Sequence, residues 1–141
     1  MHLIEAETLG YCTDMRSGEA KRDLGRLGEQ TAEAFLCAQR YRVIARNYRC
    51  RLGEIDLVVR DGPTLVFVEV RSQTGQAFGD PLESVTLRKQ RQIAKAAVHY
   101  VVAHRLEEQP MRFDVIGIRW VEGHPHFSHV KAAFELPAKG W

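Results

Sequence analysis

The sequence predicts an α/β sandwich, in which helices flank a central mixed β-sheet in the order αβββαββ. Apolar residues follow helical spacing in two segments, at about 20–40 and 83–104. Apolar runs of strand length lie between these segments and after the second one. With 141 residues, of which 45% are hydrophobic and 27% charged, the chain fits one domain with its own core.

The first predicted helix runs from about residue 20 to 40. Its main apolar stripe consists of Leu24, Leu27, Thr31, Ala34, Phe35 and Ala38. Gly25 and Gly28 weaken the first turns, but they would permit close approach of another element. Glu29 lies nearly opposite the stripe, beside Ala32 and Leu36, so it is either a solvent-facing acid or a site residue. We expect residues 1–20 to be an N-terminal extension, 21–135 the single domain and 136–141 a C-terminal tail.

After a first strand at about 41–48, a hairpin is predicted from segments 53–60 and 65–71. The predicted apolar faces are Ile55, Leu57 and Val59 in one strand, and Val66, Val68 and Val70 in the other. The intervening Asp61-Gly62-Pro63 is a turn signal. A three-residue loop would put acid against an apolar face, and a two-residue Asp61-Gly62 loop would require a ladder hydrogen bond from proline. A four-residue loop over 61–64 avoids both faults.

This loop length sets the register of the hairpin. It places Arg60 opposite Leu65, Asp56 opposite Glu69, and Glu54 opposite Arg71. Directly opposed side chains have Cβ atoms ~5 Å apart, where like charges destabilise the pair. Asp56 and Glu69 therefore require a cation between them. We expect Mg²⁺ or Mn²⁺, because these ions are held by one or two carboxylates together with water and phosphate oxygens.

The remaining elements complete the predicted sandwich. A loop at 73–82 leads to the second helix, whose buried residues are predicted to be Ile93, Ala97, Tyr100 and Val101. A strand at 112–120 places Phe113 and Val115 on one face and Asp114 on the other, and a last strand lies near 126–134. Asp114 is either a further acid of the site or a structural hydrogen-bonding residue.

Several motifs, in this order along the chain, resemble the YraN family, a bacterial family placed in the restriction-endonuclease-like, or PD-(D/E)xK, superfamily. The resemblance covers roughly residues 22–134 and implies a restriction-endonuclease-like sandwich. The motifs are Gly28-Glu29, Arg46-Asn47, Gly53-Glu54-Ile55-Asp56, Phe67-Val68-Glu69-Val70-Arg71, Phe78-Gly79-Asp80-Pro81, Lys89 and Arg112-Phe113-Asp114-Val115.

The resemblance implies a metal-dependent nuclease with Asp56 and Glu69 as the metal-binding pair. It puts Arg71 where the superfamily usually has lysine, offers Glu29 as an additional acid, and marks Lys89 as a further catalytic candidate. Arginine stays protonated, so Arg71 cannot be a general base, although it can bind phosphate or stabilise a transition state. The sequence lacks the Gln-x-x-x-Tyr pattern of RecB-like nucleases, because Gln90 and Gln92 precede alanines at that spacing.

Two basic runs flank the acidic pair and predict contact with DNA phosphates, although the net charge is only +2. The runs are Arg40, Arg42, Arg46, Arg49 and Arg51, and Arg88, Lys89, Arg91 and Lys95. Of these, we expect Arg46, Arg49, Arg51, Arg88 and Arg91 to bind nucleic acid. The alternative is that each run is a solvated face.

The cysteines indicate a reducing compartment. Cys12, Cys37 and Cys50 form no C-x-x-C motif, so we expect no disulfide and a cytoplasmic protein. No run approaches the ~18 apolar residues of a membrane span, and no membrane insertion is expected. A zinc site at His124, His126 and His129 is less favoured than a solvated loop or edge strand, since cysteine partners are missing.

These observations predict a Mg²⁺- or Mn²⁺-dependent nuclease-like protein. It would bind DNA, with branched structures or free ends as substrates, in recombination or repair, and a homodimer is compatible with this function. Two alternatives stay open: a catalytically silent nucleic-acid-binding module, and an interaction protein of a larger assembly. Metal-dependent cleavage would distinguish the enzyme, and salt-sensitive binding without cleavage the module.

Overall fold

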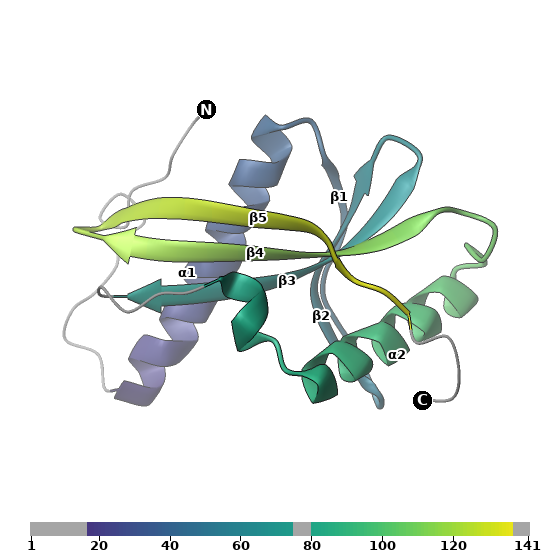
Figure 1. The fold of residues 1–141 in the computed structure, drawn as a ribbon, viewed down its shortest axis with the longest axis horizontal. Coiled ribbons are helices and arrows are strands. Elements are labelled where there is room, and N and C mark those ends of the chain that lie inside the picture. Colours follow the sequence, from purple (N-terminus) through teal and green to yellow (C-terminus); the bar gives the residue numbers. More distant parts are fainter. Residues whose placement is uncertain (1–16, 75–79, 137–141) are drawn as a thin grey trace.

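The computed structural model describes residues 17–74 and 80–136 and shows an α/β sandwich around a five-stranded mixed sheet (Figure 1). The elements are α1 (Ser17–Ala38), β1 (Arg42–Cys50), β2 (Gly53–Asp61), β3 (Thr64–Thr74), the 3-10 helix η2 (Pro81–Ser84), α2 (Leu87–Ala103), β4 (Met111–Val121) and β5 (His124–Phe134). The strands lie in the order β1-β2-β3-β4-β5, with β3 and β4 parallel and the other neighbours antiparallel. The predicted fold class is confirmed.

Element boundaries differ from the prediction at two helix starts. Helix α1 begins at Ser17, so residues 17–20 belong to the helix and not to the predicted extension. Residues 1–16 of that extension and 137–141 of the predicted tail lie outside the described residues. Helix α2 begins at Leu87 instead of near 83, because the Thr86 hydroxyl accepts a hydrogen bond from Lys89 N and caps the helix there.

The two helices cover opposite faces of the sheet, and α1 passes behind the strands in Figure 1. The central strand β3 is consequently buried on both faces: Leu65 and Phe67 pack on the side of α2, whereas Val66 and Val68 pack on the side of α1. A strand with both faces covered typically has a nearly continuous run of apolar residues in its sequence. The prediction of a single dry face for β3 was therefore incomplete.

Helix α1 packs its second face as tightly as its main stripe. Ala32 and Leu36 are fully buried, while Ala38 of the predicted stripe is exposed. A Cβ added at Gly28 would lie 2.1 Å from Ser72 Oγ of β3, so the absence of a side chain there brings the helix close to the strand. The predicted close approach through a helical glycine is confirmed at Gly28.

The β2–β3 hairpin has the predicted register, with Arg60 opposite Leu65. Its ladder continues to Asp61 and Thr64, so the turn is Gly62-Pro63 and not the predicted four-residue loop. Gly62 adopts a φ of 59°, in the left-handed region that glycine favours, and Pro63 stays outside the ladder.

The predicted common face of Ile55, Leu57 and Val59 was wrong. Ile55 packs on the side of α2, whereas Leu57 and Val59 pack on the side of α1. The period-two alternation breaks at Asp56, next to the last paired residue of the ladder with β3, Leu57.

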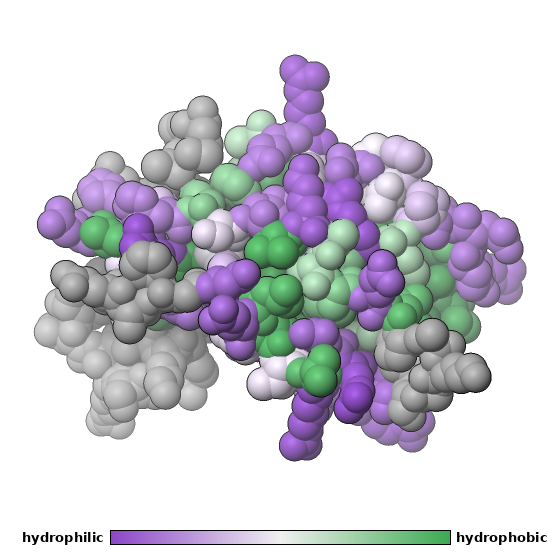
Figure 2. Space-filling model, viewed as in Figure 1, coloured by the Kyte–Doolittle hydropathy of each residue, from purple (hydrophilic) through white to green (hydrophobic). Residues whose placement is uncertain are grey.

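Polar residues surround the sheet at the surface. Figure 2 shows hydrophilic side chains around the rim of one face and apolar ones gathered near its centre. Partly buried residues that pack against the α2-side core include Leu82, Val130, Ala133 and Phe134. Within residues 17–74 and 80–136, neither helix has the length and apolar character needed to cross a membrane.

The close contact between β4 and η2 predicts that one methyl group added at Gly117 lowers the stability of the fold. A Cβ at Gly117 would lie 2.3 Å from Pro81 Cγ, and the rigid proline ring cannot rotate away. We expect Gly117→Ala to lower the free energy of unfolding by about 1–3 kcal/mol. Gly25→Ala is the matched control, since nothing lies within 4 Å of its Cβ position, and it should gain about 0.5–1 kcal/mol. Urea titration measures both, and equal stabilities would contradict the tight contact.

Candidate active site

Two acidic side chains meet where the β2–β3 ladder ends. The last regular pair is Leu57 with Val68. Immediately beyond it, Asp56 Oδ2 accepts a hydrogen bond from Val70 N at 2.8 Å, so a side chain replaces the backbone acceptor of the ladder. Glu69 is only 5% exposed and lies within hydrogen-bonding reach of Asp56. The structure thus brings Asp56 and Glu69 together as expected, through their side chains and not through ladder pairing.

Burial and mutual repulsion determine the protonation of this acid pair. Burial, followed by the charge of Asp56, raises the pKa of Glu69 from 4.5 to about 8. Burial also raises the pKa of Asp56, although the hydrogen bonds from Val70 N and Glu69 act to lower it. Without a bound cation, the two carboxyl groups therefore retain a proton near neutral pH.

Two cationic side chains approach the acid pair. Arg71 Nη2 lies 3.2 Å from Glu69 Oε2. The Nε atom of Arg71 is buried and has no hydrogen-bond partner among the described residues. Lys89, in the first turn of α2, lies close enough for its charge to oppose the rise in the pKa of both Asp56 and Glu69. A strand and a helix thus supply positive charge to the same point.

Glu29 approaches the pair from α1. Burial, followed by the charge of Asp56, raises the pKa of Glu29, while a hydrogen bond with Asn47 opposes this rise. Asn47 belongs to β1 and has a φ of 50°, a conformation that asparagine tolerates better than most residues. Glu29 is half-buried, so of the two interpretations that the sequence left open, the structure places its side chain near Asp56 and Asn47. The sequence marked Asn47 only as part of the Arg46-Asn47 motif and gave it no role of its own.

A groove of about 430 Å³ lies between the β1–β2 turn and α2. Its lining includes Arg49, Arg51, Glu54, Lys89 and Gln92. The turn lies close to the helix, because a Cβ at Gly53 would be 2.7 Å from the backbone oxygen of Gln92. Residues from both predicted basic runs therefore line one groove, next to the acid pair.

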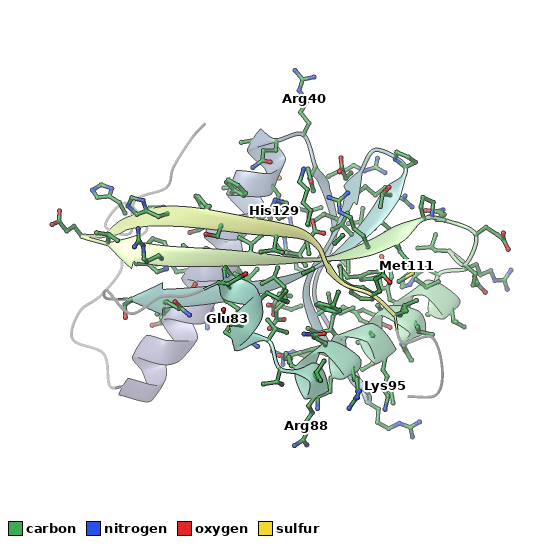
Figure 3. The ribbon with its side chains drawn as sticks, viewed as in Figure 1. Arg40, Glu83, Arg88, Lys95, Met111 and His129 are labelled. Atoms are coloured by element: carbon green, nitrogen blue, oxygen red, sulfur yellow. The ribbon has the colours of Figure 1, made fainter. Side chains whose placement is uncertain are left out.

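The other predicted DNA-binding arginines lie elsewhere. Arg46 donates to Glu33 of α1 through two hydrogen bonds of 2.7 and 2.6 Å. Arg88 points away from the body of the protein in Figure 3, and Arg91 lines a different groove with Glu135. Of the five predicted phosphate-binding arginines, only Arg49 and Arg51 line the groove at the site. The Nε atom of Arg49 also lies 3.3 Å from Oε2 of Glu54.

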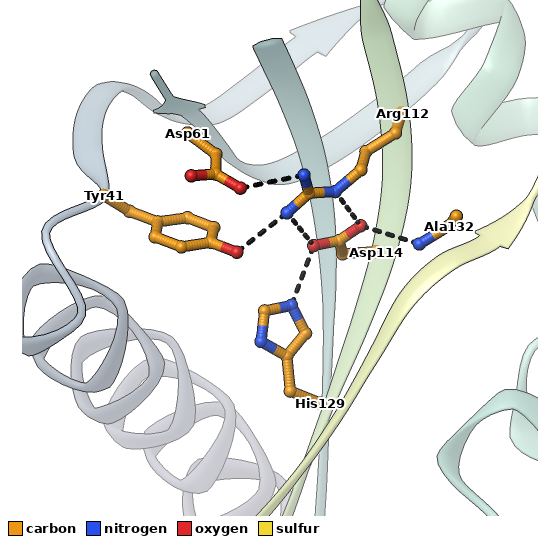
Figure 4. A network of polar contacts seen from close by, with 6 residues as sticks. All are labelled: Tyr41, Asp61, Arg112, Asp114, His129 and Ala132. Atoms are coloured by element: carbon orange, nitrogen blue, oxygen red, sulfur yellow. Dashed lines mark hydrogen bonds and ion pairs between the residues drawn. The ribbon is translucent and has the colours of Figure 1, made fainter. Parts of the chain in front are cut away.

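Asp114 belongs to a separate, structural network (Figure 4). It is fully buried at the β-bulge between β4 and β5. Its carboxylate accepts hydrogen bonds from Arg112, His129 Nε2 and Ala132 N. Arg112 also donates to Asp61 and Tyr41.

The network keeps Asp114 ionised. Burial alone would raise the pKa of Asp114, but the hydrogen bonds from His129, Arg112 and Ala132 together lower it below its ordinary value. Every oxygen of the carboxylate is occupied, so Asp114 has the structural role that the sequence left open. His129 is engaged here, and in the described parts of the chain no group of three or more His, Cys, Asp or Glu is placed to hold a metal ion.

The acid pair lies within a part of the chain that matches a known protein family. The family described as "Uncharacterised protein family UPF0102" matches residues 28–118, a range that contains all five of the predicted catalytic residues. The chain belongs to this family, which is the YraN family that the motifs indicated.

Curated relatives match over most of their length. A UPF0102 protein of Anaeromyxobacter dehalogenans is 45% identical over 118 residues, covering 84% of this chain and 88% of the relative. A UPF0102 protein of Geobacter metallireducens is 46% identical over 115 residues, covering 82% of this chain and 94% of the relative. A relative from Geotalea uraniireducens is 44% identical over 116 residues, with coverage of 82% and 91%.

The raised pKa of Glu69 predicts a pH-dependent stability. In the folded protein Glu69 holds its proton up to about pH 8, whereas the unfolded chain releases it near 4.5. Between these values the folded state binds more protons, so the stability of the metal-free protein should fall as pH rises, by at most about 1.4 kcal/mol per pH unit. Unfolding at several pH values with a chelator present measures this slope.

Glu69→Gln provides the comparison for this pH dependence. The variant should lose most of the slope between pH 5 and 8 that wild type shows. Other groups titrate in this range too, so the difference between the two proteins is the quantity of interest. Parallel curves for wild type and Glu69→Gln would show that Glu69 titrates normally and would contradict its burial against Asp56.

Proposed function

We propose that this protein is a metal-dependent phosphodiesterase that acts on DNA, in the processing of recombination or repair intermediates. The observation that carries this proposal is the buried pair of Asp56 and Glu69, with Arg71 and Lys89 around it. A desolvated acid pair is unfavourable unless a cation compensates it. Buried perturbed carboxyl groups with cationic neighbours are typical of functional sites.

The donor set fits a hard divalent ion. Two carboxylates, completed by water and phosphate oxygens, are the usual ligands of Mg²⁺ and Mn²⁺. Asp56 and Glu69 would hold the ion, and the hydrogen bond from Val70 N orients Asp56 for this purpose. When bound, the ion would neutralise charge on a phosphodiester oxygen as a Lewis acid.

Arg71 would bind the scissile phosphate. Its buried Nε is an unused donor, and its Nη2 is held by Glu69 at 3.2 Å, so the guanidinium is oriented before any substrate arrives. A planar fork of donors matches phosphate oxygens, and a preoriented donor stabilises charge in the transition state. Since arginine cannot accept a proton, Arg71 would act by binding alone.

Lys89 would supply the compact ammonium charge that the superfamily usually places at the position of Arg71. It comes from α2 and not from β3, but its charge acts on Asp56 and Glu69 alike. Glu29 would supply an additional acid to the metal site from α1. The groove with Arg49 and Arg51 would hold the phosphates next to the cleaved bond.

One observation favours a second function, a catalytically silent DNA-binding module. The ion pair between Arg71 and Glu69 compensates one carboxylate of the site without any metal. Such compensation would lower the affinity for a divalent ion while leaving the basic groove intact. Metal binding and cleavage distinguish the two functions directly.

The first test of the proposal is metal binding by wild type and by two neutral variants. Mn²⁺ at about 100 times its Kd should stabilise wild type by about 2.7 kcal/mol, because the ion binds only the folded state. Asp56→Asn and Glu69→Gln should lose most of this gain, whereas Glu107→Gln, which removes an exposed acid far from the pair, should retain it. Thermal unfolding with and without Mn²⁺ measures the effect. A full metal response in Asp56→Asn would rule out the site.

The same proteins then decide whether chemistry follows binding. Wild type and Glu107→Gln should cleave at least one member of a panel of linear, flapped and four-way DNA substrates with Mn²⁺, and both neutral variants should be inactive. If wild type binds Mn²⁺ but cleaves nothing, while Arg71→Lys gains cleavage that Asp56→Asn abolishes, the silent module is the correct function.

The groove predicts a salt-dependent contribution to DNA affinity. Replacing Arg49 and Arg51 by alanine should weaken binding to all sequences alike and reduce the slope of log K against log salt by up to about 1.8, for two lost phosphate contacts. The matched control is the double variant of Arg88 and Arg91, which removes equal charge outside the groove. Anisotropy titrations at several salt concentrations measure both slopes. Equal effects of the two double variants would assign the contribution to net charge alone.

A further inference from the structure

A second polar pocket lies beside the acid pair, on the other side of Arg71. It has a volume of about 290 Å³ and is formed by β3, β4, β5 and η2. Its polar lining consists of Arg71, Gln73, Arg119, His126 and Ser128. None of the described residues that line it is an Asp or Glu, in contrast to the groove at the β1–β2 turn.

The strand register builds this pocket from two rows of residues. Arg71, Gly117 and Ser128 lie side by side across β3, β4 and β5. Gln73, Arg119 and His126 form the next row on the same face. The rows are two residues apart along each strand, which corresponds to roughly 6.6 Å. Glu69 precedes Arg71 on this face by the same step, so the acid pair and the pocket are contiguous.

The 3-10 helix η2 bounds one side of the pocket. Gly117 forms part of the floor, and the Pro81 ring of η2 stands against it. Strand β5 contributes His126 and Ser128 to the lining. The pocket is more enclosed than the groove lined by Arg49 and Arg51. A more enclosed pocket suits the end of a chain, whereas a continuous backbone needs an open groove.

We propose that this pocket binds the terminal phosphate of a DNA strand, one step beyond the phosphodiester at Asp56 and Glu69. The proposal rests on the proposed function and specifies its substrate as DNA with a phosphorylated end. A terminal phosphate is a monoester with a charge near −2 at pH 7, more than a backbone diester carries. Two arginines offer it forked donors, Gln73 and Ser128 offer neutral donors, and His126 adds a charged donor when protonated.

Arg71 would then contact two groups of one substrate, the phosphodiester at the acid pair and the terminal phosphate in the pocket. Its Nη2 lies at Glu69, while the side chain also lines the pocket, and its buried Nε lacks a partner among the described residues. A terminal phosphate in the pocket would bind the same guanidinium that contacts Glu69. It would also set the distance from the strand end to the bond at the acid pair.

The test measures binding to hairpin DNA that has a single end and a fluorophore in its loop. The three probes carry a 5′-phosphate, a 3′-phosphate or only hydroxyls at that end. A chelator is present, so that no cleavage is required. One phosphorylated probe should bind at least about 10-fold tighter than the hydroxyl probe at the same salt concentration. Inorganic phosphate should compete for this gain, which shows that the phosphate group itself is recognised.

Variants assign the preference to the pocket. Arg119→Gln and Ser128→Ala should each reduce the preference for the phosphorylated probe while leaving affinity for the hydroxyl probe nearly unchanged. Ser128 is exposed on β5, so this variant tests the pocket even if Arg119→Gln fails to fold. Arg88→Gln removes one positive charge far from the pocket and should retain the full preference.

Two results would overturn the proposal without touching the proposed function. Equal binding of phosphorylated and hydroxyl probes would exclude recognition of a terminal phosphate. A preference that persists in both pocket variants would place that recognition elsewhere. Failure of wild type to bind any of the probes would instead overturn DNA as the substrate, and the terminal-phosphate site with it.

Discussion

The arrangement of this protein depends on two carboxyl groups, Asp56 and Glu69, that are buried side by side where the central ladder ends. Burying like charges together is costly, and the pKa of Glu69 is raised to about 8 as a result. The surrounding elements converge on this point. Helix α1 brings Glu29, α2 brings Lys89, and β3 itself continues into Arg71. Under the proposed function, a divalent cation with a phosphate ligand would compensate this pair.

The contrast with Asp114 supports this interpretation. Asp114 is buried more completely than Asp56 and lies on a neighbouring part of the same sheet. Its pKa is nevertheless lowered, because Arg112, His129 and Ala132 N satisfy both carboxylate oxygens. Burial alone therefore does not determine the protonation of an acid in this fold. The surroundings make the distinction: the donors around Asp114 lower its pKa, whereas those around Asp56 and Glu69 do not offset the effect of burial.

Arg71 connects the site to the rest of the surface. Its guanidinium contacts Glu69 on one side and lines the polar pocket of β3, β4 and β5 on the other. The lining of this pocket continues to Arg119 and His126, whereas the groove with Arg49 and Arg51 approaches the acid pair from β1 and β2. Basic side chains thus lie on two sides of the acids, and under the proposed function they would contact phosphates on both sides of the cleaved bond.

The sequence by itself determined the order of elements, the hairpin register and the meeting of Asp56 with Glu69, because the Asp61-Gly62-Pro63 turn signal and the requirement for an even-numbered loop constrain pairing locally. It left open the roles of Glu29 and Asp114, since a helical wheel shows which side chains share a face but not which face a second layer covers. It also predicted DNA contacts for Arg46, Arg88 and Arg91, which the fold keeps out of the groove at the site. The row of Arg71, Gly117 and Ser128 joins residues far apart in the chain through strand pairing. Only the tertiary structure decided such contacts, because burial and long-range pairing depend on the packing of the whole sheet between its helices.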